Sequence, residues 1–184
     1  MKITKMSLVA ALLIGSSAMA LENTKITGDA NLFYQTSDGY VTNGTNNDGL
    51  FSSGKSSADM SVNLNVTTDV LKTDSVAISA GVSYTVLTTL GLDGQVVDNV
   101  WGGAHNGVED ASWVNEAWFA GTSANTTVKV GRMELDTPLA FTETWTIEKN
   151  TFEAGVLINQ DIPDTTLVGA YVGRGNGVVN YNNS

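Results

Sequence analysis

Polar and apolar residues alternate along much of this chain, most clearly over 58–70. In that stretch Met60, Val62, Leu64, Val66 and Val70 occupy even positions, whereas polar residues occupy the odd positions. Successive side chains of a β-strand point to opposite faces of a sheet, so a period of two predicts a strand with one apolar and one polar face. The stretch is long enough to be a strand of about ten residues.

The same alternation predicts six further strands. After a short turn at 71–74 it resumes over 76–86, which predicts a hairpin with 58–70. The remaining predicted strands cover 25–35, 114–121, 126–133, 151–159 and 166–174. Three features fit less well: Phe33 interrupts the polar positions of its strand, Arg132 shares parity with Val128 and Val130, and 166–174 has apolar residues at both parities.

Long and short connections alternate between the predicted strands. Those near residues 72, 124 and 162 are short, whereas 36–57, 88–112 and 134–150 are long and rich in Gly, Asn and Asp. Transmembrane β-barrels have short turns on one side and longer loops on the other, with aromatic residues near the strand ends. A soluble β-sandwich also alternates apolar and polar positions but gives no reason for every second connection to be long. The pattern therefore favours an all-β, antiparallel transmembrane barrel.

In such a barrel the two faces of each strand meet different surroundings. We expect the apolar residues of 58–86 to face lipid, namely Met60, Val62, Leu64, Val66, Val76, Ile78 and Val82, and Asn63, Asn65, Ser79 and Ser83 to face water. Polar-face residues that would line the lumen are Asp59, Asn63, Asn65, Asp69, Lys129 and Glu153.

The first twenty residues have the order of a secretory signal peptide. Lys2 and Lys5 precede a short apolar run, and Ala18-Met19-Ala20 is a small-x-small cleavage site. The run is too short for a membrane-spanning helix, which needs roughly 20 residues. We therefore expect export through the Sec pathway, cleavage after Ala20, and a barrel domain over 21–184 in the outer membrane of a Gram-negative bacterium.

Composition and charge exclude several function classes. The formal net charge is −10 and loss of the two leader lysines makes it more negative, so the chain is a poor partner for nucleic acid. There is no cysteine, and the single histidine, His105, lies in a glycine-rich segment, so neither a zinc site nor a hydrolytic triad can be assembled. We expect no catalytic residues, no cofactor and no metal site.

One part of the sequence resembles a known family. GRMELDTPLAFTETW (131–145) and NTFEAGVLINQDIPDTTLVGAYVGRGNG (150–177) resemble the Opr-family porins and major outer membrane proteins of campylobacterial Gram-negative bacteria. The resemblance implies a barrel of roughly 16 to 18 strands, homotrimeric and inserted in outer-membrane lipid, through which small hydrophilic solutes and ions diffuse. Seven predicted strands are fewer than that and odd in number, so we interpret the chain as the N-terminal portion of a porin.

The resemblance also implies a position for the pore constriction. In the family the loop after the fifth strand folds inward, which corresponds here to about 134–150. With Arg132 at its entrance, this segment holds one lysine, Lys149, against four carboxylates: Glu134, Asp136, Glu143 and Glu148. Because a narrow channel focuses the field of its wall charges, an acidic constriction predicts a preference for cations. The alternative is that these acids only solvate an extracellular loop.

Two other function classes remain open at this level. One is a small closed barrel that serves as a structural anchor or adhesin, which needs an eighth strand. The other is a soluble, secreted β-sandwich that binds glycans through Trp101, Trp113 and Trp118.

Overall fold

The computed structural model describes residues 21–36, 49–51, 56–91, 110–144 and 147–176. Within these residues seven strands form one antiparallel sheet, in which each strand pairs with its neighbours in sequence order. The strands are β1 (Glu22–Thr36), β2 (Ser56–Lys72), β3 (Ala77–Thr88), β4 (Asp110–Ser123), β5 (Thr126–Met133), β6 (Thr151–Asn159) and β7 (Leu167–Asn176). The described part of the chain has no helix long and apolar enough to span a membrane.

All seven predicted strands are confirmed, as is the antiparallel all-β class. The first, second and fourth strands extend beyond both of their predicted ends, and Val76 precedes β3 instead of belonging to it. Val76 is held in the turn instead, where its carbonyl accepts a hydrogen bond from the Thr73 amide at 2.8 Å and its amide donates to the Thr73 hydroxyl at 3.1 Å. The predicted leader, 1–20, and Trp101 lie outside the described residues.

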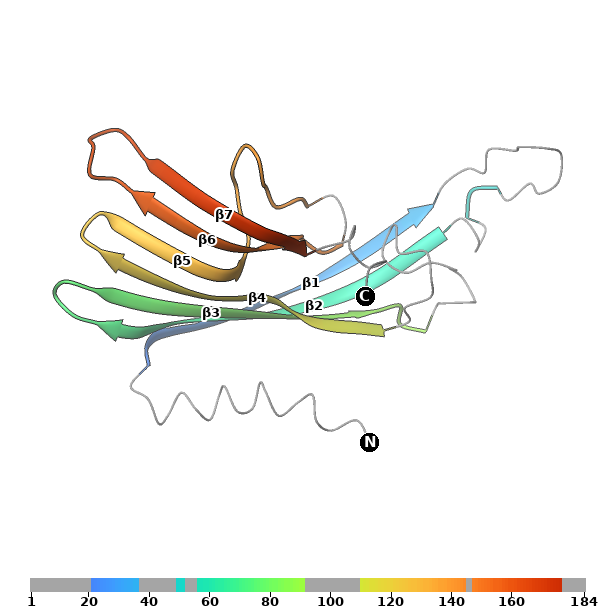
Figure 1. Ribbon diagram of the computed structural model, residues 1–184. Coiled ribbons are helices and arrows are strands. Elements are labelled where there is room, and N and C mark those ends of the chain that lie inside the picture. Colours follow the sequence, from blue (N-terminus) through green and yellow to red (C-terminus); the bar gives the residue numbers. More distant parts are fainter. Residues whose placement is uncertain (1–20, 37–48, 52–55, 92–109, 145–146, 177–184) are drawn as a thin grey trace.

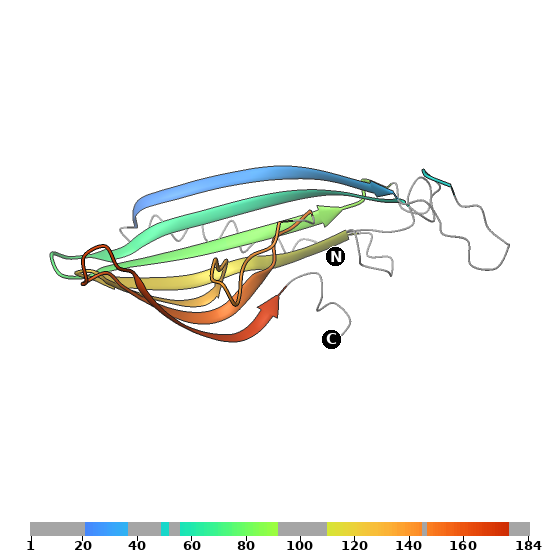
Figure 2. The ribbon, with the colours of Figure 1, turned by 90° about the horizontal axis from the view of Figure 1, so that it is seen from above.

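The sheet is curved into a trough (Figures 1 and 2). The three short connections, between β2 and β3, β4 and β5, and β6 and β7, lie together at one end of the strands (Figure 1). The segment that follows β5 lies on the concave side of the trough (Figure 2). The described strands belong to one sheet, whereas a β-sandwich is built from two sheets packed face to face.

Burial in this sheet is inverted relative to a soluble protein. Large apolar side chains on the convex face are exposed, among them Ile26 (49%), Leu32 (79%), Val62 (48%) and Val86 (43%). Polar side chains on the concave face are buried, among them Asp59, Ser61, Asn63, Ser83 and Thr85. Water as the only solvent would penalise this arrangement, whereas a barrel wall with lipid outside requires it.

Both faces of the sheet carry large apolar side chains at β6 and β7. Phe152, Val156 and Ile158 lie on the concave face, where Val156 and its neighbours pack against Met133 and Leu135. The convex face of the same strands carries Leu157, Leu167 and Tyr171, which are 48%, 50% and 78% exposed. The two-parity pattern of 166–174 therefore has a structural cause: each face is apolar for a different reason.

Candidate functional site

A polar network on the concave face joins the sheet to the segment after β5. Asn63 of β2 lies at its centre: its amide nitrogen donates to Glu148 at 3.0 Å and to Asp29 of β1 at 2.9 Å, and its amide oxygen accepts from the Thr85 hydroxyl at 2.5 Å. Asn63 and Glu148 are 8% and 4% exposed. One asparagine thus ties three strands and a distant segment together through bonds to two carboxylates.

Apolar packing beside the network holds the same segment. Ile147 is 7% exposed and packs with Leu87 of β3, and Phe33, Ala111 and Trp113 surround this pair. Phe33 pairs with Asp59 across β1 and β2, on the polar, concave face. Its departure from the alternation is explained by its packing with Ile147 and Leu87, which supports a segment on the concave side of the sheet.

The first part of the segment is a compact loop. The Leu135 amide donates to the Thr142 hydroxyl at 3.0 Å, the Thr142 amide donates to the Leu135 carbonyl at 2.7 Å, and Thr137 closes a turn on Ala140. Leu135 is 7% exposed and packs with Met133 and Val156, so the loop is fixed to the wall of β5 and β6.

The charged residues of the loop remain on its accessible side. Glu134 and Asp136 are exposed, Glu143 is half-buried, and Lys149 donates to Glu134 at 3.1 Å. Glu148 differs from the other three carboxylates of the loop because it is buried and hydrogen-bonded to Asn63. The five residues predicted for the constriction are therefore divided: four carboxylates belong to the loop, and Arg132 lies elsewhere.

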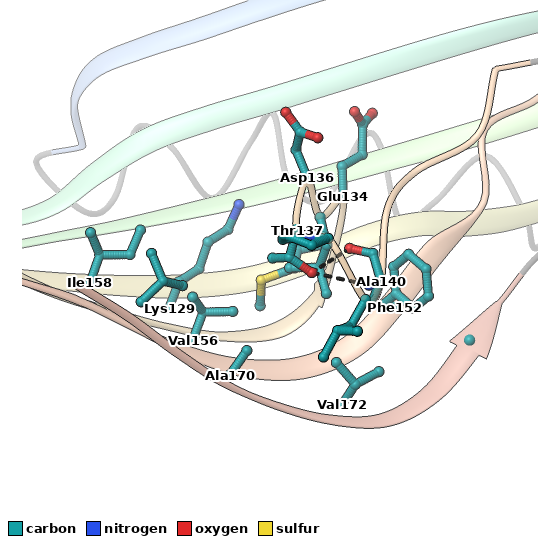
Figure 3. A pocket seen from close by; sticks show the side chains of 16 residues that line it. Lys129, Glu134, Asp136, Thr137, Ala140, Phe152, Val156, Ile158, Ala170 and Val172 are labelled. Carbon is teal, nitrogen blue, oxygen red and sulfur yellow. Dashed lines mark hydrogen bonds between the residues drawn. The ribbon is translucent and has the colours of Figure 1, made fainter. Parts of the chain in front are cut away.

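A groove of about 970 Å³ lies between this loop and the wall of β5–β7 (Figure 3). Its wall is apolar and includes Phe152, Val156, Ile158, Val168, Ala170 and Val172. The amine of Lys129 and the carboxylates of Glu134 and Asp136 point away from that wall (Figure 3). The groove is therefore amphipathic, with charged groups at its open side.

Lys129 is positioned by an aromatic ring. Its Nζ lies 4.1 Å from the ring centroid of Trp118 on β4, which is a cation–π contact. The ring in turn lies on Gly81 of β3, where a Cβ atom would approach ring carbon Cζ2 to 2.4 Å. Glycine at position 81 is thus required by close approach of the ring.

The prediction that Glu153 lines the lumen is wrong. Glu153 pairs with Arg132, and Lys129 pairs with Val156, in a register that runs without a shift from 126 to 133. Residues three apart on such a strand point to opposite faces, so Glu153 and Arg132 lie on the convex face. The concave groove lies on the apolar parity of β6, so the polar parity that carries Glu153 is the convex one.

The other predicted lumen residues lie on the concave face. Asp59, Asn65 and Asp69 share parity with Asn63; β2 pairs with β1 without a shift from 56 to 67 and with β3 without a shift from 60 to 69. Further carboxylates on this face, among them Asp29 and Glu116, were not among the predicted site residues. Asp29 falls on the polar positions of 25–35, so alternation could have identified it. The face on which Glu116 lies depends on the irregular register near Ser83 and Tyr84, which alternation does not reveal.

Among the described residues no group of three or more His, Cys, Asp or Glu side chains is arranged to hold a metal ion. This face offers carboxylates, amides, hydroxyls and lysine amines for reversible binding, and it has an apolar wall at β5–β7.

Comparison with known proteins gives matches only among solved structures. No protein-family model matches the chain, and no curated protein matches it. OccK8 (OprE) of Pseudomonas aeruginosa matches with a TM-score of 0.62 and 17% identity, over 87% of this chain and 35% of that protein. OccAB3 of Acinetobacter baumannii matches with a TM-score of 0.59 and 14% identity, over 83% of this chain and 37% of that protein.

A third match is OccK2 (OpdF) of Pseudomonas aeruginosa, with a TM-score of 0.58 and 15% identity over 86% of this chain and 36% of that protein. The chain spans about a third of the length of these structures. All three are outer-membrane porins. The seven described strands therefore have the fold of part of a porin wall: an antiparallel sheet, apolar outside and polar inside.

Proposed function

We propose that this chain is part of an outer-membrane porin that lets small hydrophilic solutes and ions diffuse through a water-filled channel. The observation that carries the proposal is the inverted burial: the concave face is polar and the convex face is apolar and exposed. The match to porin walls supports the same reading. A segment attached to the concave face by Asn63 and Ile147 would narrow such a channel.

The charges of the concave face support a preference for cations. Its strands carry carboxylates at Glu22, Asp29, Asp59, Asp69 and Glu116, against the three amines of Lys25, Lys72 and Lys129. The loop adds four carboxylates, those of Glu134, Asp136, Glu143 and Glu148, and one amine, that of Lys149. Fixed negative charge on the wall of a narrow channel raises the local concentration of cations and excludes anions.

The experiment is to record the reversal potential of the whole protein in a planar bilayer under a salt gradient. Wild type is expected to select cations, and Glu134→Gln, Asp136→Asn and Glu143→Gln together should shift the reversal potential toward anions. The shift should shrink at high ionic strength, because salt screens the remaining charges over about 3 Å at 1 M.

A matched control removes the same charge at the other end of the strands. The control variant combines Asp74→Asn, Asp161→Asn and Asp164→Asn. These three residues lie in the short connections, away from the loop after β5. This variant should keep the wild-type reversal potential. If both triple variants shift the reversal potential equally, the net charge of the protein, and not the loop, sets the preference for cations. If neither variant shifts it, the loop is not the selective constriction.

The remaining features of the protein follow from the same proposal. OccK2 (OpdF) has been solved in complex with glucuronate, and we propose small hydrophilic solutes of that size as the permeant class here. We further propose an outer-membrane homotrimer, reached by Sec export and cleavage after Ala20. The campylobacterial affinity drawn from 131–177 belongs to the proposal as well.

A further inference from the structure

Three ionised side chains meet on the convex face, where most of the large side chains are apolar. Arg132 of β5, Glu153 of β6 and Arg174 of β7 are aligned across three neighbouring strands. Both guanidinium groups donate to the same oxygen, Glu153 Oε1, at 2.9 and 2.7 Å. Two positive charges share one negative charge, so this cluster, the Arg132–Glu153–Arg174 triad, carries a net charge of +1.

The triad lies near one boundary of the hydrocarbon layer. A strand crosses that layer in about 9–11 residues. Counted from the short connections, Arg132 is the seventh residue of β5, Glu153 the seventh of β6 and Arg174 the eighth of β7. The three side chains therefore start in the third of the wall nearest the long connections, which is the outer side in a porin.

The direction of the Arg132 side chain places its charge at the boundary itself. Arg132 pairs with Ala117, but its Nη1 donates to the carbonyl of Val114 at 2.7 Å. Val114 is the tenth residue of β4 counted from the short connection. The guanidinium thus extends toward the outer side by several residues, as expected of an arginine that reaches from an apolar surface to the headgroup level.

The triad leaves hydrogen-bond donors and positive charge unused. Each guanidinium has five N–H donors and no acceptor. Arg174 is 63% exposed, and Arg132 and Glu153 line an open depression together with Val114, Ala117 and Tyr171. A site with spare donors, net positive charge and an apolar rim at headgroup level is complementary to an anion that is attached to an acyl chain.

We propose that the Arg132–Glu153–Arg174 triad binds the phosphate group of an outer-leaflet lipid, whose acyl chains lie along the apolar convex face. Phosphate matches the geometry because guanidinium groups bind its oxygens in pairs. The apolar residues beside the triad favour a lipid over free phosphate, since Tyr171 is 78% exposed and offers its ring to the chain region.

The test is a lipid titration of the whole folded protein in a neutral detergent, followed by native mass spectrometry. The probes are phosphatidic acid, phosphatidylcholine and inorganic phosphate. Phosphatidic acid should bind most tightly. Arg174→Gln should weaken that binding roughly tenfold, the loss expected for one charge-assisted hydrogen bond. Lys72→Gln, which removes one positive charge at the short-connection end of β2, should leave it unchanged.

Glu153→Gln separates a binding role from a structural one. It removes the carboxylate that competes for the guanidinium groups, so phosphatidic acid should bind at least as tightly as to wild type. Equal binding by wild type and Arg174→Gln would overturn the proposal, as would a Glu153→Gln variant that folds but loses lipid. Equal affinity for inorganic phosphate would mean a free-anion site. Dissociation of an oligomer in Arg174→Gln without a change in lipid binding would assign the surface to a second copy.

Discussion

Removing the Asn63 amide should detach the segment after β5 from the wall without unfolding the sheet. In the Asn63→Ala variant the buried Glu148 carboxylate loses a 3.0 Å hydrogen bond, and the backbone pairing of β2 with β1 and β3 remains. A hydrogen bond to a charged group contributes about 1.5–3 kcal/mol. The ratio of attached to detached segment should therefore fall by about 10- to 150-fold.

Thiol labelling can measure this ratio because the chain contains no cysteine. Ile147 is 7% exposed and packed on Leu87, so a cysteine introduced by Ile147→Cys reacts with a maleimide only when the segment detaches. When detachment is fast relative to labelling, the labelling rate follows the detached population. Asn63→Ala in this background should raise the rate by the same factor of about 10 to 150.

The control is Asn65→Ala, on the same face and two residues nearer the short connection. Within the described part of the chain, the Asn65 side chain has no hydrogen bond to the segment, so the labelling rate should stay at the parent value. The reasoning is refuted if Asn63→Ala labels no faster than Asn65→Ala. Such a result would mean that Ile147 packing alone holds the segment.

Three further predictions concern the wall, its packing and the leader. Leu64→Arg on the convex face should lower the free energy of unfolding from lipid by roughly 2–4 kcal/mol if residue 64 lies near the midplane, whereas Asn65→Arg should lower it much less. Equal losses in denaturant titrations would contradict the assigned faces. Gly81→Ala should displace the Trp118 ring and destabilise the wall by about 1–3 kcal/mol. Gly155→Ala is the control, because its Cβ would lie 3.8 Å from the nearest atom, on Val130. An unchanged Trp118 fluorescence spectrum in a single-tryptophan background would count against the contact. N-terminal sequencing of exported protein should begin at Leu21-Glu22-Asn23, and a mature protein that keeps Met1 would disprove the leader.

Local alternation was enough to predict the strands and the faces of the hairpin around the first short turn. The parity of a strand is a property of successive residues, so 58–70 reveals its two faces without knowledge of its neighbours. Turn positions follow in the same way, since the Thr73 and Ala124 turns interrupt the pattern at the sheet's short-connection end. The alternation of long and short connections then distinguished a barrel wall from a sandwich.

The sequence could not decide which face of β6 is the inner one. The apolar parity of β6 runs from Phe152 to Ile158, and pairing with β5 places that parity beside Lys129 and under the Leu135 loop. Parity states only that two residues share a face; whether that face is inside depends on register with the neighbouring strand. Glu153 was therefore placed in the lumen, whereas it lies on the convex face between two arginines.

Tertiary structure also decided what the misfit residues do. Phe33 is apolar on a polar face because Ile147, more than a hundred residues later, packs beside it. Arg132 shares parity with valines because its charge reaches Val114 and Glu153 at the end of the wall. The sequence by itself determined the strands, their turns and the polar and apolar faces of β2 and β3, because these depend on neighbours along the chain. Register, the attachment of the loop and the ionic triad depend on contacts between distant residues, and only the folded sheet brings those residues together.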